Sequence, residues 1–361
     1  TCDDCGETIS TEELPIADHN YESVVTPPAV GVQGYTTHTC SVCGDSYVDS
    51  YTDPLPEEVV LPSGNAELRI AGLTLALQSD LTMTIYVHKD AIAAGAYTNL
   101  RLEANIGNGI REVVVSEYTI YAKNYLALKI KGISPRLMND NINLRLYGTY
   151  EGQEYMYEMD YKVADYCYTQ LNDAAQPAKL KQVLVDLLYY GAAQQTYTAH
   201  NTQNLVTANL TAEQRDLASS YDLNLNNDFS FTDNTDTTTA AIVGATLILR
   251  ESVLVTFYVS TEDLTGLTMK LAVDGKTYEI DAEDFTASGS YYVVEFNDLA
   301  ARQMRSVITA ELYRDGVLTS RTLTYSVQSY ASGISTASGV NLYNVVQRMM
   351  YYGDSAKAYF S

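Results

Sequence analysis

Two cysteine pairs near the start of the chain have the residue types and spacing of a metal-binding knuckle. Their sequences are CDDCG and CSVCG. Two residues between the cysteines let a tight turn aim both sulfurs at one point, and the following glycine lets backbone N–H groups approach them. Two such pairs can surround one Zn²⁺ ion with four thiolates. We therefore predict a structural zinc site whose ligands are Cys2, Cys5, Cys40 and Cys43.

The sequence leaves alternatives open for these cysteines. The 34 residues between the pairs exceed the separation in compact zinc ribbons, so His19 or His38 could join one pair instead. In an oxidising compartment the four thiols could form two disulfides, either local or crossed. Thioredoxin-like redox chemistry is disfavoured, because nothing around either motif has a βαβ pattern. In every case the cysteines cross-link a small module that lacks a sufficient apolar core.

The other candidate nucleophiles and bases are isolated in the sequence. Cys167 suits a small residue packed on a short helix, and His88 and His200 are expected on the surface or in turns. The Gly-Asp-Ser sequences at 44–46 and 353–355 lack the strand–turn–helix context and the histidine partner of a serine nucleophile. The sequence contains no Walker, GxGxxG or HExxH motif. We predict no catalytic residues and no enzyme activity.

Acidic residues are abundant but do not follow a specific site pattern. Residues 222–228 (DLNLNND) place oxygen ligands at alternate positions, yet they lack the mid-loop glycine and the closing glutamate of a calcium loop. We interpret them as solvated linker. Paired carboxylates for glycoside hydrolysis leave no motif, but the small repeated units and the absence of Trp argue against that chemistry.

These residues are carried by two copies of one sequence pattern, at residues 64–200 and 240–361. Alternating apolar residues mark the same inward-facing strand in each copy. They are Leu81, Met83, Ile85 and Val87 in the first copy, and Val253, Val255, Phe257 and Val259 in the second. The copies end in the matching stretches VLVDLLYYGAAQQTY and VVQRMMYYGDSAKAY. We infer a tandem duplication.

The matching stretches predict an amphipathic helix at the end of each copy, because apolar residues recur at i, i+3, i+4 and i+7. Pro177 suits the start of the first helix, and shorter helices are expected at 163–171 and 327–332. Asp-Gly pairs at 274–275 and 315–316 predict hairpin turns. The predicted fold class is mainly β with short helices: a small Cys-rich module, then two homologous antiparallel β-sandwich modules, each closed by a C-terminal helical hairpin.

Four segments follow from this pattern. They are a Cys-rich, zinc-ribbon-like module at 1–56, copy A at 64–200, a polar linker with a short helix at 201–239, and copy B at 240–361.

The aromatic content is almost entirely phenolic, with 31 Tyr, 6 Phe and no Trp. Two pairs late on the terminal helices, Tyr189-Tyr190 and Tyr351-Tyr352, are expected to pack against the sheet with their hydroxyls at its rim. An exposed row of other tyrosines would form a flat amphipathic surface suited to sugars or to a protein partner. The sequence does not determine which tyrosines are exposed.

The charge balance argues against two classes of partner. The chain carries 22 Lys and Arg against 45 Asp and Glu, a formal charge of −23. Such a field repels phosphate backbones and anionic lipid headgroups, so we expect neither nucleic acid nor membrane surfaces as partners. No apolar run approaches the roughly 18–20 residues that span a bilayer. The first residue is Thr1 rather than Met, and we expect a fragment of a longer chain.

The stretch HNYESVVTPPAVGVQGYTTHTCSVCGDSYVDSYT resembles a repeat of large secreted or cell-surface proteins of gut Gram-positive anaerobes. The matching positions are His19, Gly34, Cys40, Cys43, Gly44, Ser46 and Tyr47. Val30 stands where that repeat has an earlier cysteine, which favours a site shared with Cys2 and Cys5.

The ends of the two copies resemble modules of the same kind of protein, which finish in a Tyr-Gly-Ala-Ala-Ala-Gln-x-Tyr-Phe helix. The first copy carries this ending at Tyr190, Gly191, Ala192, Ala193, Gln194 and Tyr197, and the second at Tyr352, Gly353, Tyr359 and Phe360. The resemblance implies an extracellular or bacterial cell-surface location. Such modules accompany catalytic, glycan-binding and adhesin domains alike.

The function we predict is a non-catalytic binding or adhesion segment that recognises a host or neighbouring protein. The alternative is an accessory carbohydrate-binding module for starch or mucin glycans, and the third possibility is a structural spacer. The sequence identifies no ligand-binding residue for any of them.

Overall fold

The computed structural model describes ten stretches of the chain. They are residues 21–26, 33–52, 68–77, 81–88, 97–106, 109–114, 119–121, 125–233, 239–249 and 253–360. The chain divides into two compact units, residues 1–62 and residues 63–361. The second unit contains both predicted copies together with the segment between them, and each unit is described by itself below.

The first unit contains a three-stranded antiparallel sheet in the order β1-β2-β3. Its strands are β1 (Tyr21–Thr26), β2 (Gly34–Cys40) and β3 (Ser46–Thr52). The second cysteine pair lies in the turn from β2 to β3. The Gly44 N–H donates to the Cys40 carbonyl oxygen at 3.0 Å, and the Cys40 N–H donates to the Asp45 carbonyl oxygen at 2.7 Å. Gly44 has φ 77°, which glycine adopts without steric cost.

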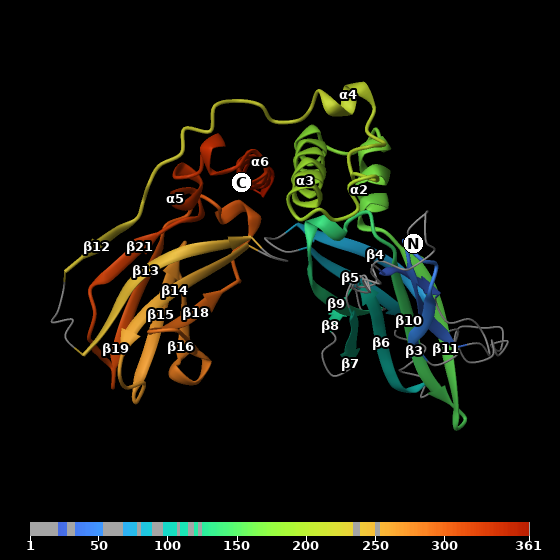
Figure 1. Ribbon diagram of the computed structural model, residues 1–361, viewed down its shortest axis with the longest axis horizontal. Helices are drawn as coiled ribbons and strands as arrows, with labels where there is room; N and C mark the ends of the chain where they lie inside the picture. Colours follow the sequence, from blue (N-terminus) through green and yellow to red (C-terminus); the bar gives the residue numbers. More distant parts are fainter. Residues whose placement is uncertain are drawn as a thin grey trace, which may run out of the picture. The chain divides into compact units, whose positions relative to one another are not determined.

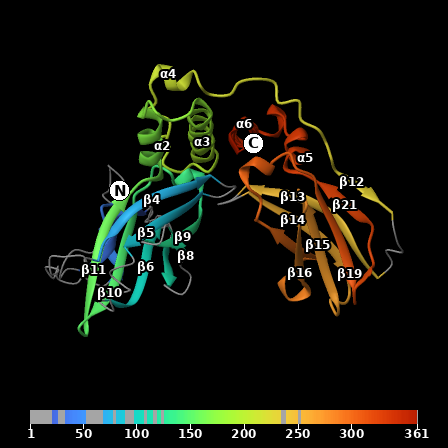
Figure 2. The same cartoon turned by 180° about the vertical axis from the view of Figure 1, so that it is seen from behind.

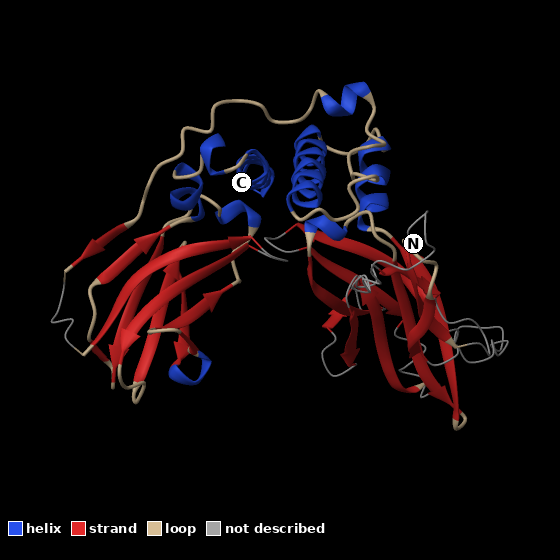
Figure 3. Cartoon of the chain, in the orientation of Figure 1, coloured by secondary structure: helices blue, strands red, loops and turns tan. Residues whose placement is uncertain are grey.

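Copy A contains two four-stranded antiparallel sheets (Figures 1 and 3). The first, in the order β4-β5-β9-β8, comprises β4 (Ile70–Leu77), β5 (Leu81–His88), β9 (Tyr125–Ile133) and β8 (Thr119–Tyr121). The second, in the order β11-β10-β6-β7, comprises β11 (Gln153–Tyr161), β10 (Ile142–Tyr150), β6 (Thr98–Ile106) and β7 (Gly109–Val114).

Copy B repeats this arrangement. Its first sheet, β13-β14-β18-β17, comprises β13 (Ala240–Leu249), β14 (Val253–Thr261), β18 (Tyr291–Phe296) and β17 (Thr286–Ser288). Its second sheet, β12-β21-β19-β15-β16, comprises β12 (Ser230–Thr232), β21 (Thr322–Tyr325), β19 (Ile308–Arg314), β15 (Leu267–Val273) and β16 (Lys276–Asp281), and β20 (Val317–Leu318) pairs with β19. The predicted mainly β, antiparallel sandwich fold is confirmed.

The predicted inward-facing strands form the centre of each core. Met83 and Ile85 in β5 and Val255 and Phe257 in β14 are all at most 1% exposed. Both copies also have a β-bulge at the same place, between Ile70 and Gly72 in copy A and between Ile242 and Gly244 in copy B. A shared bulge is a position-specific feature of a sheet, so it supports the duplication independently of the sequence match.

The predicted hairpin turns are also present. Asp274 and Gly275 have φ values of 50° and 78°, and Asp315 and Gly316 have values of 49° and 79°. Two consecutive residues with positive φ form the tight turn that suits the twist of a two-stranded hairpin.

The α-helices lie at one end of each copy's sheets (Figures 1 and 2). The α-helices are α2 (Val163–Asn172), α3 (Ala178–Tyr197), α4 (Ala212–Arg215), α5 (Val327–Ser332) and α6 (Val340–Phe360). The 3₁₀ helices are η2 (Pro135–Leu137), η3 (Ala282–Asp284), η4 (Ala301–Gln303) and η5 (Thr336–Ser338). Pro177 is the N-cap of α3, as its position in the sequence predicts.

The glycine in each Tyr-Tyr-Gly sequence brings its helix close to a 3₁₀ helix. A Cβ atom on Gly191 would lie 2.9 Å from the Pro135 carbonyl oxygen. A Cβ atom on Gly353 would lie 2.6 Å from Met304 Cγ and 3.0 Å from the Ala301 carbonyl oxygen. The two copies therefore use the same close backbone approach to dock the terminal helix on η2 or η4.

The segment that we predict to be a polar linker is partly integrated into the second unit. Val206 and Leu210 are at most 5% exposed, and α4 follows them. Beyond α4, β12 is the edge strand of copy B's second sheet rather than unstructured chain. A short extended segment beside an unpaired edge gains a row of backbone hydrogen bonds, which explains why this polar sequence is ordered there.

Replacing Gly353 with Ala is expected to lower the free energy of unfolding by about 1–3 kcal/mol, because the new methyl group overlaps Met304 and the Ala301 carbonyl. In an unconstrained helix the same change would raise stability by about 1 kcal/mol. Urea denaturation measures the sign. Gly244→Ala is the matched control, because its Cβ would meet no atom within 4 Å. A Gly353→Ala chain at least as stable as the wild type would contradict the close approach.

Candidate functional site

The structure describes half of the predicted zinc site. Cys40 is buried at the end of β2 and Cys43 is exposed in the following turn, whereas Cys2 and Cys5 lie outside the described residues. The Cys40–Gly44 turn is closed by a backbone hydrogen bond with Gly44 at positive φ, and two cysteine sulfurs on one turn fit the donor chemistry of Zn²⁺. Among the described residues no group of three or more His, Cys, Asp or Glu side chains is placed to hold a metal ion. The four-cysteine site therefore stays a prediction.

His38 takes part in a row of hydrogen bonds across the first sheet. Its Nδ1 atom lies 2.9 Å from Ser23 Oγ, and its Nε2 atom lies 2.8 Å from Asp49 Oδ1. The bonds from His38 and Ser50 lower the pKa of Asp49. Serine, histidine and aspartate are the side chains of a hydrolytic triad, but Ser23 is exposed on an open strand, which does not exclude water from a reaction. Because both ring nitrogens are engaged here, the structure gives His38 a cross-strand role.

The other candidate nucleophiles and bases are dispersed. The His200 ring lies 2.7 Å from Asp140 after the end of α3, and the His88 ring packs 4.9 Å from that of Tyr125 at the end of β5. Cys167 is fully buried on α2, where burial raises the pKa of its thiol to about 12. The packing role that we predict for Cys167 agrees with this position.

Cys167 is expected to resist alkylation in the folded chain and to react only after unfolding, because its thiolate is not accessible at neutral pH. Iodoacetamide labelling with peptide mass mapping measures this for each cysteine separately. If Cys167 is labelled as fast as a free low-molecular-weight thiol in solution while the chain stays folded, its burial is contradicted.

The Gly-Asp-Ser and calcium-like segments each have structural partners. Asp354 accepts from Arg305 Nε at 2.6 Å and from the Tyr221 hydroxyl at 2.9 Å, and Asp45 accepts from the Tyr21 hydroxyl at 2.6 Å. In the calcium-like segment the Asp228 carboxylate accepts from copy B side chains, at 2.7 Å from both Ser326 and Gln328. Asp222 instead accepts from the backbone of Asn224. The two carboxylates thus serve separate local contacts.

The terminal helices of the two copies pack against each other through equivalent residues. The Tyr190 ring of α3 and the Tyr352 ring of α6 are at most 1% exposed, 6.1 Å apart and inclined by 18°. Burial raises the pKa of Tyr190 to about 12, and Gln194 donates to its hydroxyl oxygen at 3.0 Å. The expectation that these tyrosines pack on the sheet with hydroxyls at its rim is therefore corrected: Tyr190 and Tyr352 pair with each other between helices.

A second equivalent pair in this helix contact carries opposite charges. Asp186 of α3 is 1% exposed and accepts from the Ser219 N–H and hydroxyl, both at 2.8 Å. Arg348, at the same position of α6, donates to the Ser219 carbonyl oxygen at 3.1 Å and lies 4.6 Å from the centre of the Tyr189 ring. Ser219 belongs to the connecting segment, so this segment is held by both copies at once.

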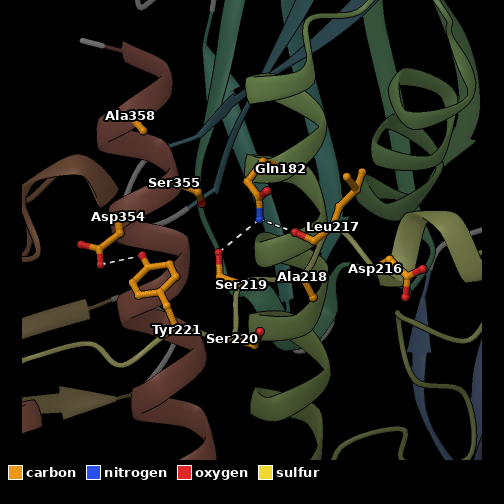
Figure 4. Close-up of a pocket in the computed structure, with 10 residues that line it drawn as sticks. All are labelled: Gln182, Asp216, Leu217, Ala218, Ser219, Ser220, Tyr221, Asp354, Ser355 and Ala358. Carbon is orange, nitrogen blue, oxygen red and sulfur yellow. Dashed lines mark hydrogen bonds between the residues drawn. The ribbon is translucent and has the colours of Figure 1, made fainter.

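A pocket of about 480 Å³ opens beside this contact (Figure 4). Gln182 from α3 and Asp354 and Ser355 from α6 line it, together with residues 216–221 of the connecting segment. Gln182 donates to Ser219 Oγ at 3.1 Å and Tyr221 donates to Asp354, as Figure 4 shows. Much of the polar lining is thus occupied in holding the helices and the segment together.

Asp186→Asn is expected to lower the free energy of unfolding by about 1–3 kcal/mol. The substitution replaces one of the two carboxylate oxygens that accept from Ser219 with an NH₂ group, which is a donor and faces another donor. Urea denaturation of the whole chain measures the loss. Asp216→Asn is the matched control on the exposed part of the same segment. Equal stability of Asp186→Asn and the wild type would show that the buried carboxylate does not hold Ser219.

The surface best suited to contact another molecule is the outer face of copy A's second sheet. Alternate residues of β10, such as Leu144 and Leu146, are fully buried, so the residues between them face away from the core. The side chains on this outer face include Arg101, Glu103, Asn143, Arg145, Tyr147, Glu154, Met156, Glu158 and Asp160. Tyr147 is the most buried of them, at 7% exposed.

Interlocked contacts order the outer face. The Arg101 guanidinium lies 3.9 Å from the centre of the Tyr147 ring and donates to Glu154 at 2.7 Å, which raises the pKa of the arginine. Arg145 donates to Glu158 at 3.1 Å. Burial, and then the neighbouring Glu103 carboxylate, raise the pKa of Tyr147. The charged groups are held in place by these pairs and half-buried rather than freely mobile.

Copy B has the same strand pairing on this face, but its acidic and basic residues occupy opposite positions. Arg145 opposite Glu103 in copy A corresponds to Glu311 opposite Lys270 in copy B. Tyr313, which stands at the position of Tyr147, donates to Glu311 at 2.7 Å. The copies therefore share core positions and helix docking, and they differ on the exposed sheet.

The sequence alone did not identify this face. Its residues come from β6 and from the later β10–β11 hairpin, and each strand carries ordinary alternating polar positions. The tyrosine at the shared position, Tyr147 and Tyr313, was the available signal, because it recurs in both copies on an otherwise polar side.

The comparisons with known proteins place the chain in no family. No protein-family model and no curated protein matches it. Among solved structures, a red sea bream transglutaminase is 9% identical over 83% of this chain, which spans only 38% of that enzyme's chain, with a TM-score of 0.18. A structure concerning host cell surface retention of a 1.5-MDa bacterial ice-binding adhesin is 12% identical over 81% of this chain and 73% of that chain, with a TM-score of 0.19. At these TM-scores neither similarity supports an argument.

None of the helices in the described part of the chain is long and apolar enough to cross a membrane.

Proposed function

We propose that the chain is a non-catalytic binding segment of an extracellular, bacterial cell-surface protein, and that the outer face of copy A recognises a host or neighbouring protein. In this proposal the four cysteines of the first unit hold a structural zinc ion. The paired helices of the second unit serve to keep the two sandwiches together.

The observation that carries the proposal is the composition and order of the outer face. Tyr, Arg and Met are enriched at protein interfaces, and here Arg101, Tyr147 and Met156 lie side by side across three strands. Tyr147 is only 7% exposed because Arg101 covers its ring, so Arg101 and Met156 present the accessible contact surface. An arginine already stacked on a tyrosine loses little conformational freedom when a partner covers it, so less binding energy is spent on ordering the surface. The different charges on copy B support recognition specific to one copy.

Arg101→Ala is expected to weaken capture of a partner from mucosal extract, immunoglobulin or bacterial cell-surface extract by about tenfold or more, as truncation of an interface arginine commonly does. Surface plasmon resonance with the whole chain immobilised measures it. Lys270→Ala, on the equivalent sheet of copy B, is the control and should leave capture unchanged. Capture of nothing by the wild type, or equal capture by wild type and Arg101→Ala, would refute the proposal.

The pocket between Gln182 of α3, Asp354 of α6 and residues 216–221 favours accessory carbohydrate binding as a second candidate function. Its lining includes the Asp216 carboxylate and the Ser220 hydroxyl, with the half-exposed Tyr221 ring beside them, which is chemistry that sugar hydroxyls and sugar rings require. A chain that captures no protein but is retarded in polysaccharide-containing gels would favour this function. A chain without either ligand would favour a structural spacer.

A further inference from the structure

We propose that the open edge of β11 in copy A is the docking site for an extended basic segment of the protein partner, which adds to the sheet as an antiparallel strand. This inference rests on the proposed function and names the part of the copy A surface that a partner's backbone engages.

The edge of β11 is long and regular. All nine residues of β11 pair with β10, from Gln153 opposite Tyr150 to Tyr161 opposite Ile142. Among the described residues no strand pairs with the other side of β11, which ends the order β11-β10-β6-β7 (Figure 1). An edge strand presents unpaired N–H and C=O groups, which are the groups that bind an added strand.

The hairpin turn determines which backbone groups point outward. Glu151 and Gly152 form a two-residue turn with φ values of 49° and 81°. In such a hairpin the residues that flank the turn exchange both hydrogen bonds, and the bonded pairs then alternate along the ladder. The N–H and C=O groups directed away from β10 therefore belong to Glu154, Met156, Glu158 and Asp160.

Copy B already contains an added strand at the equivalent edge. Tyr325 of β21 lies opposite Ile308, just as Tyr161 of β11 lies opposite Ile142. β12 pairs antiparallel with β21 along this edge, and Ser230 Oγ lies 2.8 Å from Thr324 Oγ1. The fold therefore accommodates an extended segment at this position without rearrangement of the sheet.

The side chains on the copy A edge select the charge of the added strand. β12 lies opposite Thr322 and Thr324 in copy B, and the equivalent residues of copy A are Glu158 and Asp160. Glu154 adds a third carboxylate further along the same side. Glu154 and Glu158 also accept from Arg101 and Arg145 within the outer face, whereas Asp160 accepts from the neutral Asn143. Opposite charges across neighbouring strands are favourable and like charges are not, so Lys or Arg fits at alternate positions of the partner.

In the added strand, the residue between two basic positions faces the core side of the sheet. Phe231 of β12 occupies this position opposite Leu323, which is fully buried. The partner segment therefore has basic and apolar residues in alternation. The net charge of −23 on the whole chain also speeds its encounter with such a segment.

A peptide of alternating Lys and Val, with the nine-residue length of β11, tests this inference on the whole chain. We expect saturable binding and slower hydrogen exchange at the amides of Glu154, Met156, Glu158 and Asp160, measured by NMR. Asp160→Lys should weaken binding about fivefold or more, because one attractive cross-strand pair becomes repulsive. A peptide with Glu in place of Lys should bind more weakly to the wild type and better to Asp160→Lys.

Glu279→Lys is the matched control, because it changes one exposed carboxylate to lysine on β16, the edge of copy B's second sheet. It should leave peptide binding unchanged. Equal losses in the two variants, or peptide binding without slower exchange on β11, would show adsorption by net charge and overturn the proposal.

The two proposals fail in different ways. If the peptide does not bind but Arg101→Ala still abolishes partner capture, the edge is not the docking site and the outer face remains one. If the wild-type chain captures no partner and binds no peptide, the proposed function itself fails.

Discussion

The packing of α3 against α6 is the contact on which the organisation of the second unit depends. It joins equivalent residues of the two copies, and the Tyr190 and Tyr352 rings at its centre are almost fully removed from solvent. Burying two tyrosine rings against each other contributes apolar burial, and the pair geometry adds about 0.5–1.5 kcal/mol. The glycine next to each ring lets the same helix dock closely on η2 or η4.

The two copies carry opposite charges at one pair of equivalent positions in this contact. A contact between equivalent residues of identical copies would bring two aspartates or two arginines together. Here Asp186 and Arg348 occupy the equivalent positions and both bind Ser219 of the connecting segment. Arg305 extends the arrangement by binding Asp354 of α6 and the Leu223 carbonyl oxygen. The polar segment between the copies is therefore a structural part of the unit, although its composition is that of a linker.

The same division between shared and altered positions extends to the sheets. Buried positions such as Ile85 and Phe257 keep apolar side chains, because a core tolerates changes of shape better than changes of polarity. The outer face exchanges Arg145 and Glu103 for Glu311 and Lys270 while it keeps a tyrosine beside them. The acidic and basic members of a partly solvated ion pair can exchange places at little cost in free energy. The exposed faces of the two copies therefore differ while their cores stay alike.

The sequence by itself determined the local elements of this protein. Period-two alternation in Leu81–Val87 and helical periodicity before Gly191 and Gly353 predicted the strands and terminal helices, because each signal lies within one segment. The match between copies predicted a repeated fold for the same reason. The tertiary structure decided which of these residues face each other.

Three features depended on contacts between distant parts of the chain. The Tyr190–Tyr352 pair, the addition of β12 to β21 and the assembly of the outer face each join residues from separate strands or helices. Local pattern indicates that a side chain points to one side of its element. It does not indicate which other element covers that side, because this is set by the packing of the whole unit.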